Sequence, residues 1–213
     1  MILQVDYNNF AKTFSKSREN MKWEEIEYFL GNYDLEAKSV LDIGCGNGRF
    51  LSAIKEKNIN FGKYLGLDLS SGLLEEASKL HPENEFLNLN MLDLDKIESK
   101  FDTIFFIASF HHLQKLEDRI EVLKKARNLL SEDGKIFFTN WNLIGQEKYK
   151  KSKIENSQNE FLSLDFNIKI GEFDRYYHGF SLKELDYLFK EALFELIENR
   201  VFDSGRNIIS IVK

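Results

Sequence analysis

The 213-residue chain contains very little cysteine and no long hydrophobic run. Because Cys45 is the one cysteine, the chain cannot close an internal disulfide, which fits the reducing conditions of the cytoplasm. No apolar stretch approaches the roughly 20 residues that a membrane-spanning helix needs. The first residues, Met1–Asp6, lack the basic and apolar regions of a signal peptide. We therefore expect a cytoplasmic protein without a membrane partner.

Positive charge is also scarce, because 29 Lys and Arg residues stand against 35 Asp and Glu residues, a net charge of −6. This balance argues against a large nucleic-acid-binding surface, although it is compatible with a local basic patch. The hydrophobic content of 43% and the charged content of 30% are typical of a globular protein. We expect residues 1–213 to form a single domain, with a helical cap at 1–35 and an insertion on the substrate side at 142–180.

What the chain does show is a regular alternation of apolar strand-like runs and amphipathic helical stretches. The run 101–108 is apolar almost throughout, so it should lie at the centre of a parallel sheet. A capping box at Ser181–Glu184 opens the last predicted helix. The predicted strands are 39–43, 63–68, 85–89, 101–108, 135–141, 194–202 and 206–212, and the predicted helices are 47–57, 71–80, 117–130, one beginning at 181, and two short ones within 7–31. The pattern predicts an α/β fold with a mostly parallel sheet and a terminal hairpin.

The most informative motif is LDIGCGNG at residues 41–48, between the first predicted strand and the first helix of the alternation. Glycine is needed where the backbone adopts a positive φ or where a ligand approaches the main chain closely. The start of the following helix leaves N–H groups that face the same space. The motif therefore predicts a binding site for a polar or anionic ligand group, and nucleotide, flavin and methyl-donor folds all use such a turn.

A second motif, GLDLS at residues 66–70, places Asp68 about 20 residues beyond the glycine turn, where a carboxylate can meet ribose hydroxyls. A dehydrogenase would more often carry a third glycine where Arg49 stands. Together, the two motifs resemble motifs I and II of the class I S-adenosylmethionine-dependent methyltransferases. The resemblance implies a Rossmann-like, seven-stranded sheet and S-adenosyl-L-methionine as donor, with S-adenosyl-L-homocysteine as product. It implies donor contacts from Asp42, Gly44, Cys45, Gly46, Asn47, Asp68 and Leu69.

The ends of the third and fourth predicted strands extend the resemblance. Asn90 and Met91 lie where this family usually offers an acid to the adenine amino group. The amide oxygen of Asn90 can accept the same hydrogen bond, and Asp93 is the alternative. Ala108 ends the fourth strand, next to the place that the resemblance assigns to the sulfonium. Cys45 is interpreted as a small filler of the turn and not as a nucleophile.

Two adjacent histidines, His111 and His112, follow the fourth predicted strand. On regular structure their side chains should point apart, and no carboxylate or cysteine cluster completes a metal site, so we expect no metal. One histidine is expected to bond the backbone at this turn, and the other to face the substrate. We include His111 in the predicted catalytic set.

Two further stretches resemble a narrower family, the tRNA wobble-uridine (carboxymethyluridine) methyltransferases. One is the N-terminal segment from Tyr7 to Arg18, and the other is DRYYHGF at residues 174–180, similar to that family's R-Y-Y-H signature. The family converts a carboxymethyl group on the wobble uridine into its methyl ester. The resemblance therefore implies tRNA modification, with a tRNA anticodon loop as substrate and a small activating protein as partner.

A carboxylate acceptor needs no general base, because it is already ionised at neutral pH. It needs cationic groups that orient one oxygen toward the methyl group, and a pocket that excludes water. Arg18 and Arg175 are the predicted clamps, with Tyr176, Tyr177 and His178 as hydrogen-bonding or base-stacking walls. The other interpretation of residues 175–178 is an amphipathic strand that packs its aromatic side chains inward. The predicted catalytic residues are Arg18, His111, Arg175, Tyr177 and His178.

Two other functions fit the same motifs. The chain could methylate a small carboxylate, hydroxyl or amine metabolite, for which the acidic net charge is no obstacle. It could also be a non-catalytic, donor-binding subunit that activates a partner. The glycine turn and Asp68 predict donor binding under all three hypotheses.

Overall fold

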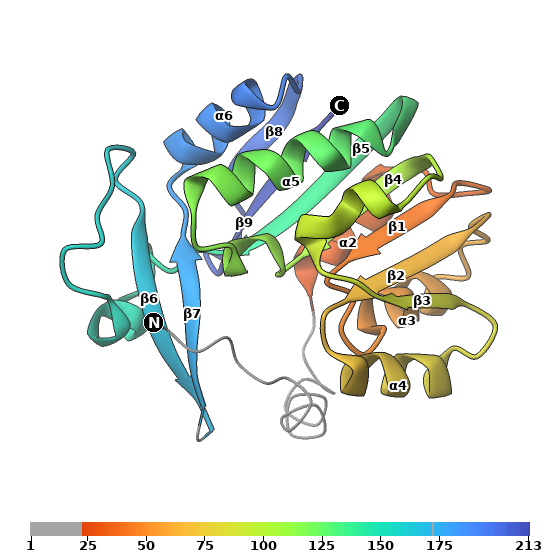
Figure 1. The fold of residues 1–213 in the computed structure, drawn as a ribbon, viewed down its shortest axis with the longest axis horizontal. Coiled ribbons are helices and arrows are strands. Elements are labelled where there is room, and N and C mark those ends of the chain that lie inside the picture. The colour runs from red at the N-terminus through yellow and green to blue at the C-terminus, as the bar shows by residue number, and fades with distance from the viewer. Residues whose placement is uncertain (1–22, 172) are drawn as a thin grey trace.

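The protein is described from a computed structural model that defines residues 23–171 and 173–213 (Figure 1). In this part of the chain, seven strands form one sheet in the order β3-β2-β1-β4-β5-β9-β8. Strand β9 runs antiparallel to both β5 and β8, and the other pairings are parallel. The strands are β1 (Val40–Ile43), β2 (Tyr64–Asp68), β3 (Glu85–Asn88), β4 (Phe101–Ile107), β5 (Leu130–Trp141), β8 (Leu196–Val201) and β9 (Asn207–Val212). This topology confirms the predicted Rossmann-like methyltransferase fold.

Helices cover both faces of the sheet (Figure 1). Helices α5 (Leu116–Asn128) and α6 (Leu182–Glu191) pack over one face, and α2 (Glu24–Asn32) and α3 (Arg49–Glu56) pack over the other. Helix α4 (Ser71–Leu80) lies against β2 and β3. None of the described helices is long and apolar enough to cross a membrane.

The central position of β4 follows from its apolar sequence, because its side chains are buried on both faces of the sheet. Phe105 stacks on Phe137 of β5 on one face, with ring centroids 5.0 Å apart. Phe106 stacks on Phe138 on the other face, with centroids 4.9 Å apart. Such cross-strand aromatic pairs stabilise a sheet beyond the burial of area alone, so the two layers of the core are anchored on the same strand pair.

The predicted capping box is confirmed in one of its two hydrogen bonds: the Ser181 hydroxyl accepts from the Glu184 N–H at 3.1 Å, whereas the Ser181 N–H donates to Ser163 Oγ and not to Glu184. Two predictions about the strands were wrong. Strand β5 begins at Leu130 and not at 135, so residues 131–134, left between the predicted helix and strand, lie within a strand whose register shifts against β4. The first helix expected within 7–31 lies outside the described residues.

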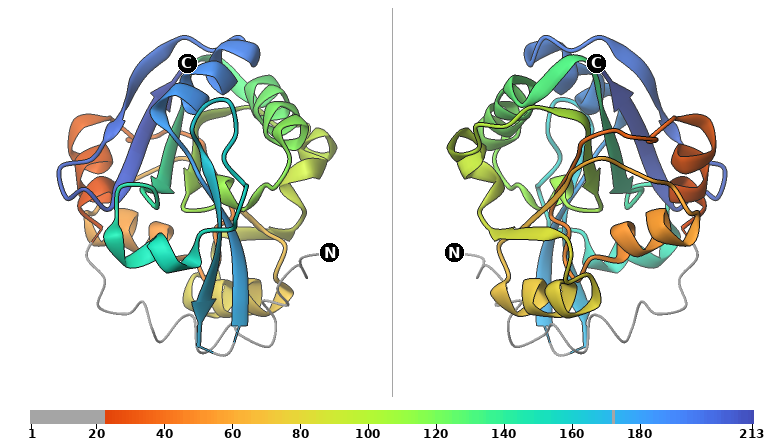
Figure 2. Two further views of the ribbon diagram at one scale, coloured as in Figure 1. Left: turned by 90° about the vertical axis from the view of Figure 1, so that its left-hand side faces the viewer. Right: turned by 90° about the vertical axis from the view of Figure 1, so that its right-hand side faces the viewer.

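The second difference concerns residues 142–174, for which no strand was predicted. Strands β6 (Leu164–Ile170) and β7 (Phe173–Gly179) form a separate antiparallel hairpin, preceded by the 3₁₀ helix η3 (Glu147–Ser152). Figure 2 shows the hairpin lying across the side of the molecule at which the parallel strands end. Strand β7 contacts η2 (Phe110–His112), the turn that follows β4. The hairpin thereby faces the end of the central strand.

Candidate active site

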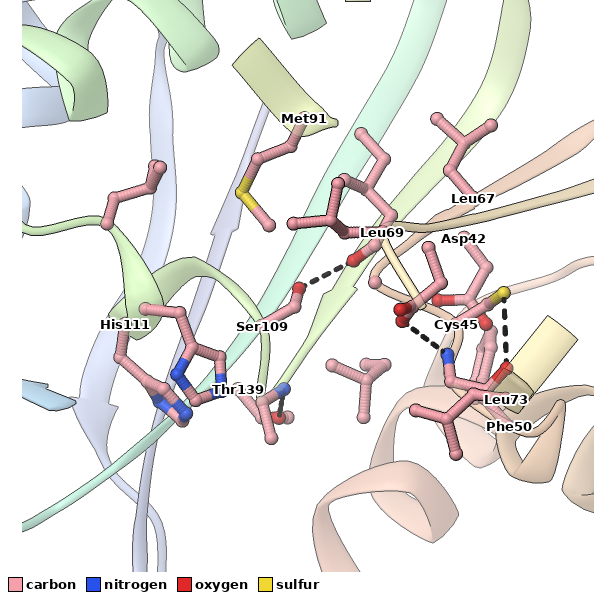
Figure 3. A pocket seen from close by; sticks show the side chains of 18 of the residues that line it. Asp42, Cys45, Phe50, Leu67, Leu69, Leu73, Met91, Ser109, His111 and Thr139 are labelled. Atoms are coloured by element: carbon pink, nitrogen blue, oxygen red, sulfur yellow. Dashed lines mark hydrogen bonds between the residues drawn. The ribbon is translucent and has the colours of Figure 1, made fainter. Parts of the chain in front are cut away.

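A cavity of about 510 Å³ lies at the carboxyl ends of β1, β2 and β4. Residues from the ends of these strands and from the start of η1 (Met91–Lys96) form one side, and β7 contributes Arg175, Tyr176 and Tyr177. Figure 3 shows His111 toward one end of the cavity and Asp42 and Cys45 toward the other. Ligands of open parallel sheets bind at this edge, and the volume suits an organic ligand. Every predicted donor-binding residue lines this cavity: Asp42, Gly44, Cys45, Gly46, Asn47, Asp68, Leu69, Asn90, Met91 and Ala108.

The turn after β1 depends on its glycines. Gly44, Gly46 and Gly48 have φ angles of +80°, +55° and +80°, values that other residues rarely adopt. A Cβ atom at Gly44 would also lie 2.4 Å from the Cβ of Ser109. The Ser109 hydroxyl donates a hydrogen bond to the Ile43 carbonyl oxygen at 2.5 Å, which holds the ends of β1 and β4 together. At its glycines the turn thus presents only backbone atoms to the cavity, at the place where the two strand ends meet.

Asp68 holds the same turn from the end of β2. One carboxylate oxygen accepts a hydrogen bond from the Gly46 N–H at 2.9 Å, and the other accepts one from the Ser70 N–H at 2.8 Å. Burial raises the pKa of this carboxyl, and its backbone hydrogen bonds oppose the rise. The carboxylate retains lone pairs for further donors such as ribose hydroxyls.

Asp42 is fully buried, yet it lines the cavity. The Tyr64 hydroxyl donates to its Oδ2 at 2.8 Å, whereas Oδ1 has no hydrogen-bond partner among the described residues. Burial raises the pKa of the Asp42 carboxyl to about 7. A buried acceptor atom without a partner costs stability, so this position suits a ligand that brings an N–H group or a positive charge.

Cys45 behaves as a packing residue, in agreement with its interpretation from the sequence. Its side chain is buried, and burial raises the pKa of the thiol well above its usual value. Its Sγ atom fills the space over Gly66, where an added Cβ would lie 2.9 Å away. The thiol is therefore neutral and unreactive, and the residue contributes to the cavity through the backbone of the turn.

Of the two residues proposed from the sequence to contact the adenine, Asn90 and Asp93, only Asn90 lines the cavity. The Asn90 side chain accepts a hydrogen bond from the Leu92 N–H at 3.0 Å and begins η1. Asp93, the alternative to Asn90, is absent from the cavity lining and pairs with Lys96. Ala108 has a φ of +52°, a strained backbone conformation of the kind that clusters at functional sites. Its N–H donates to Thr139, and this anchors the strained residue at the cavity.

The prediction that His111 and His112 point apart was wrong. Both line the cavity, and their ring centroids lie 4.7 Å apart, because they belong to the tight turn η2 and not to a strand. The Trp141 N–H donates to Nδ1 of His111 at 3.3 Å, so Nε2 of this ring carries the proton. Nδ1 of His112 lies 3.3 Å from the Tyr176 carbonyl oxygen and donates to it. Each histidine thus both bonds the backbone and faces the cavity.

Burial lowers the pKa of His112 to about 4, and the nearby Arg175 adds to this effect. The ring is therefore neutral at physiological pH and is a weak base. Beside it, Tyr177 stacks on Trp141 with centroids 4.8 Å apart and an interplanar angle of 10°. The second end of the cavity is consequently a wall of neutral aromatic rings with one guanidinium, that of Arg175, which is 2% exposed. Arg18, the other predicted clamp, lies outside the described residues.

The assignment of His178 to the substrate site needs correction. His178 does not line the cavity, and its two ring nitrogens contact Asp165 at 2.7 Å and Glu184 at 2.8 Å. Glu184 in turn accepts a hydrogen bond from Arg119 at 2.7 Å. Side chains alternate along a strand, so His178 points to the face of β7 opposite to Tyr177. We name Arg119, Asp165, His178 and Glu184 the buried ion network.

One pair of cavity residues could not be expected from the sequence motifs. The guanidinium of Arg49, at the start of α3, lies 4.2 Å from the ring centroid of Trp23, just before α2. This cation–π contact joins segments that are far apart in the chain, so no local pattern signals it.

Comparisons with known proteins agree with this geometry. Residues 41–136 match a family described as a methyltransferase domain. A protein of Encephalitozoon cuniculi that is named as a methyltransferase is 27% identical over 194 residues, which cover 91% of this chain and 87% of the relative. The tRNA (carboxymethyluridine(34)-5-O)-methyltransferase of Saccharomyces cerevisiae is 31% identical over 137 residues, 64% of this chain. The match spans 47% of the yeast protein, about half its length.

Other similarities are broader. The Ubiquinone biosynthesis O-methyltransferase of Neisseria meningitidis is 29% identical over 124 residues, 55% of this chain and 50% of the relative. Among solved structures, a methyltransferase in complex with the Haloferax volcanii Trm112 methyltransferase activator superposes with a TM-score of 0.74. The superposition covers 99% of this chain and 98% of the other at 14% identity, which shows a shared fold. Taken with the glycine turn, Asp68 and the strand order, these similarities assign residues 41–136 to a methyltransferase domain and show that the chain has the class I methyltransferase fold.

Proposed function

We propose that the protein transfers a methyl group from S-adenosylmethionine to the carboxymethyl group of a wobble uridine in tRNA and forms its methyl ester. The observation that carries the proposal is the pairing of a buried arginine, Arg175, with the rings of His112 and Tyr177, which contact His111 at its end of the cavity. The names and the similarity of the yeast relative support the same substrate.

The donor fits the other end of the cavity. The glycine turn offers main chain without side chains, Asp68 offers a carboxylate to hydroxyl groups, and Asp42 offers an acceptor atom to a cationic group. Asn90 and Met91 lie where a base would complete the site. When bound, the donor supplies an electrophilic methyl group on a positively charged sulfur.

The acceptor end suits a nucleophile that is already ionised. A carboxylate oxygen forms the new bond to the methyl carbon as the carbon–sulfur bond breaks, so no proton moves. Neutral His112, with its low pKa, is too weak a base to deprotonate a hydroxyl group efficiently. The Arg175 guanidinium can orient a carboxylate by two parallel hydrogen bonds, and the surrounding rings exclude water. The chemistry therefore favours an acid over an alcohol as acceptor.

Methylation of a small metabolite is the second candidate. It is supported by the similarity to an enzyme of ubiquinone biosynthesis, and by a cavity volume that a donor and a small acceptor could share. We also propose a small activating partner protein, as in the complex that shares this fold. Full turnover by the purified chain alone would argue against that partner.

Nucleoside mass spectrometry distinguishes the candidates. tRNA that carries carboxymethyluridine is incubated with the purified protein and a donor labelled in its methyl group. The proposal predicts a labelled methyl ester on that nucleoside. Label found only in small metabolites from a cell extract supports the second candidate, and no label in either sample, with or without an added partner, supports a non-catalytic role.

Arg175→Ala tests the acceptor site in the same assay. We expect kcat/KM to fall by at least about 10-fold while the donor Kd stays unchanged, because a charge-assisted hydrogen bond to the acceptor contributes about 1.5–3 kcal/mol. Lysine at this position should rescue only in part, since it lacks the planar fork of arginine. Arg127→Ala, on the exposed side of α5, is the matched control. A rate that climbs steeply around neutral pH would contradict a carboxylate acceptor.

A further inference from the structure

A group of lysines stands out on the surface beside the cavity. Lys148, Lys150, Lys151 and Lys153 lie in and directly after η3, and all four are exposed. We name them the lysine segment. Without these four charges the net charge of −6 would be −10, so the segment is a local exception in an acidic chain.

The lysine segment is fixed to the wall of the cavity. Tyr149 of η3 stacks on Trp141 with ring centroids 6.2 Å apart and an interplanar angle of 18°. Trp141 stacks in turn on Tyr177 inside the cavity. Directly after η3, Lys153 forms a backbone bridge with Phe166 of β6. A molecule that enters the acceptor end of the cavity therefore has these lysines at a fixed place near it.

Most of this charge is available to a partner. Lys150 pairs with Glu147 at 2.6 Å, an exposed ion pair of small net energy. Lys148 lies over the Tyr149 ring at 4.7 Å. Lys151 and Lys153 form no ion pair among residues 23–171 and 173–213. In a 3₁₀ helix, residues three positions apart share a side, so Lys148 and Lys151 project together.

We infer that the lysine segment binds the phosphate backbone of RNA, next to the nucleotide whose modified base enters the cavity. Flexible lysines on a rigid support suit phosphates, because such contacts position a nucleic acid without reading its sequence. This inference rests on the proposed function only in taking RNA as the acceptor. It gives an acidic enzyme a local surface for a polyanion at the one place where the acceptor must arrive.

The test is the binding of an anticodon stem-loop RNA by fluorescence anisotropy at 50 and 200 mM salt. The variant Lys150→Ala/Lys151→Ala/Lys153→Ala is compared with the wild type and with Lys79→Ala/Lys124→Ala/Lys190→Ala, three exposed lysines on other helices. Three lost phosphate contacts should weaken binding by at least about 10-fold at 50 mM salt. They should also reduce the salt-induced loss of affinity by about 20-fold. An unchanged donor Kd verifies the fold of each variant.

The other outcomes overturn the inference. Equal RNA affinities and salt slopes for the two triple variants would show that the lysines do not contact RNA. A wild type that binds no RNA would also overturn the inference. So would a triple variant of the lysine segment that keeps its RNA affinity but loses binding to an acidic polypeptide. RNA binding through these lysines without methyl transfer would support the lysine segment as an RNA-binding surface and refute the proposed function. The two failures are therefore distinguishable.

Discussion

Two groups of acids in this protein have opposite electrostatic surroundings. At the end of the cavity proposed to bind the donor, Asp42 and Asp68 have pKa values raised by burial, and no basic side chain forms an ion pair with either in the described part of the chain. In the buried ion network, Glu184 is as inaccessible to solvent as Asp42, and burial alone would raise its pKa, yet its contacts with His178 and Arg119 lower that pKa to about 2. Asp165 is likewise lowered by its contacts with His178 and Tyr176.

The difference separates acids that are paired with internal basic side chains from acids that have only neutral hydrogen-bond donors. Acids with internal partners hold the structure together, and here they join the β6–β7 hairpin to α5 and α6. Acids that line a cavity without a basic partner remain available to a ligand, which is typical of binding sites. The contrast explains why His178, despite its place in an R-Y-Y-H sequence, belongs to the first group.

The largest effect on stability is expected from a substitution that breaks the buried ion network. Arg119→Met should reduce the free energy of unfolding by about 3–5 kcal/mol, because it leaves the Glu184 carboxylate buried without its arginine. Urea unfolding measures it. Arg200→Met, which removes only surface ion pairs with Glu198 and Asp203, should cost about 1 kcal/mol or less. Equal losses in the two variants would refute the distinction.

Removing an acid of the cavity should instead weaken ligand binding. Asp68→Ala should raise the donor Kd by about 10- to 150-fold, since a charge-assisted hydrogen bond contributes about 1.5–3 kcal/mol. Calorimetric titration with S-adenosylmethionine measures the change, and Asp133→Ala, an exposed acid on β5, is the control. Undiminished donor binding by the first variant would exclude Asp68 from the donor site.

The pH dependence of stability gives a third contrast. Folded Asp42 holds its proton up to about pH 7, whereas the unfolded chain releases it near 3.8, so unfolding releases a proton between these values. Relative to Asp42→Asn, the wild type should lose stability as the pH rises from about 4 to 7, by at most about 1.4 kcal/mol per pH unit. The subtraction is needed because His112, with its lowered pKa, contributes the opposite slope below about pH 6.5. Parallel stability curves for the two proteins would contradict the raised pKa.

The smallest expected effect concerns Tyr64, which positions Asp42. Tyr64→Phe removes one buried hydrogen bond, and the donor Kd should rise by up to about 10-fold, equivalent to about 0.5–1.5 kcal/mol. The same change should raise the pKa of Asp42 further, because the Tyr64 hydroxyl opposes the effect of burial. Tyr28→Phe removes a hydroxyl that donates to Glu198, away from the cavity, and provides the control. Identical donor affinities for the two variants would assign Tyr64 no part in positioning.

The residues that the sequence assigns to donor binding all line the cavity, because the information that brings them together is local. The glycine turn and Asp68 lie within one β-α-β stretch, where spacing alone brings the residues to the same edge of the sheet. The positions of the residues predicted to contact the acceptor depend instead on long-range contacts. Polar and apolar residues alternate in β6, a pattern typical of a half-buried strand, but the prediction for this region followed its overall polar composition and missed the strand. The direction of His178 depends on which face of β7 packs against the core. The two histidines of η2 converge because the turn is tight, which spacing did not indicate.

The buried ion network has a consequence for how such an enzyme can change its substrate. Arg175 and Tyr177, which face the acceptor end, lie on the same strand as His178, which faces the network. The hairpin can therefore diversify on its cavity face while its other face keeps Asp165 and His178 in register with Arg119 and Glu184. A hairpin exchanged between related enzymes should be accepted only when these two residues travel with it. Changes of acceptor choice through this hairpin are thus expected at positions of β7 such as Arg175 and Tyr177.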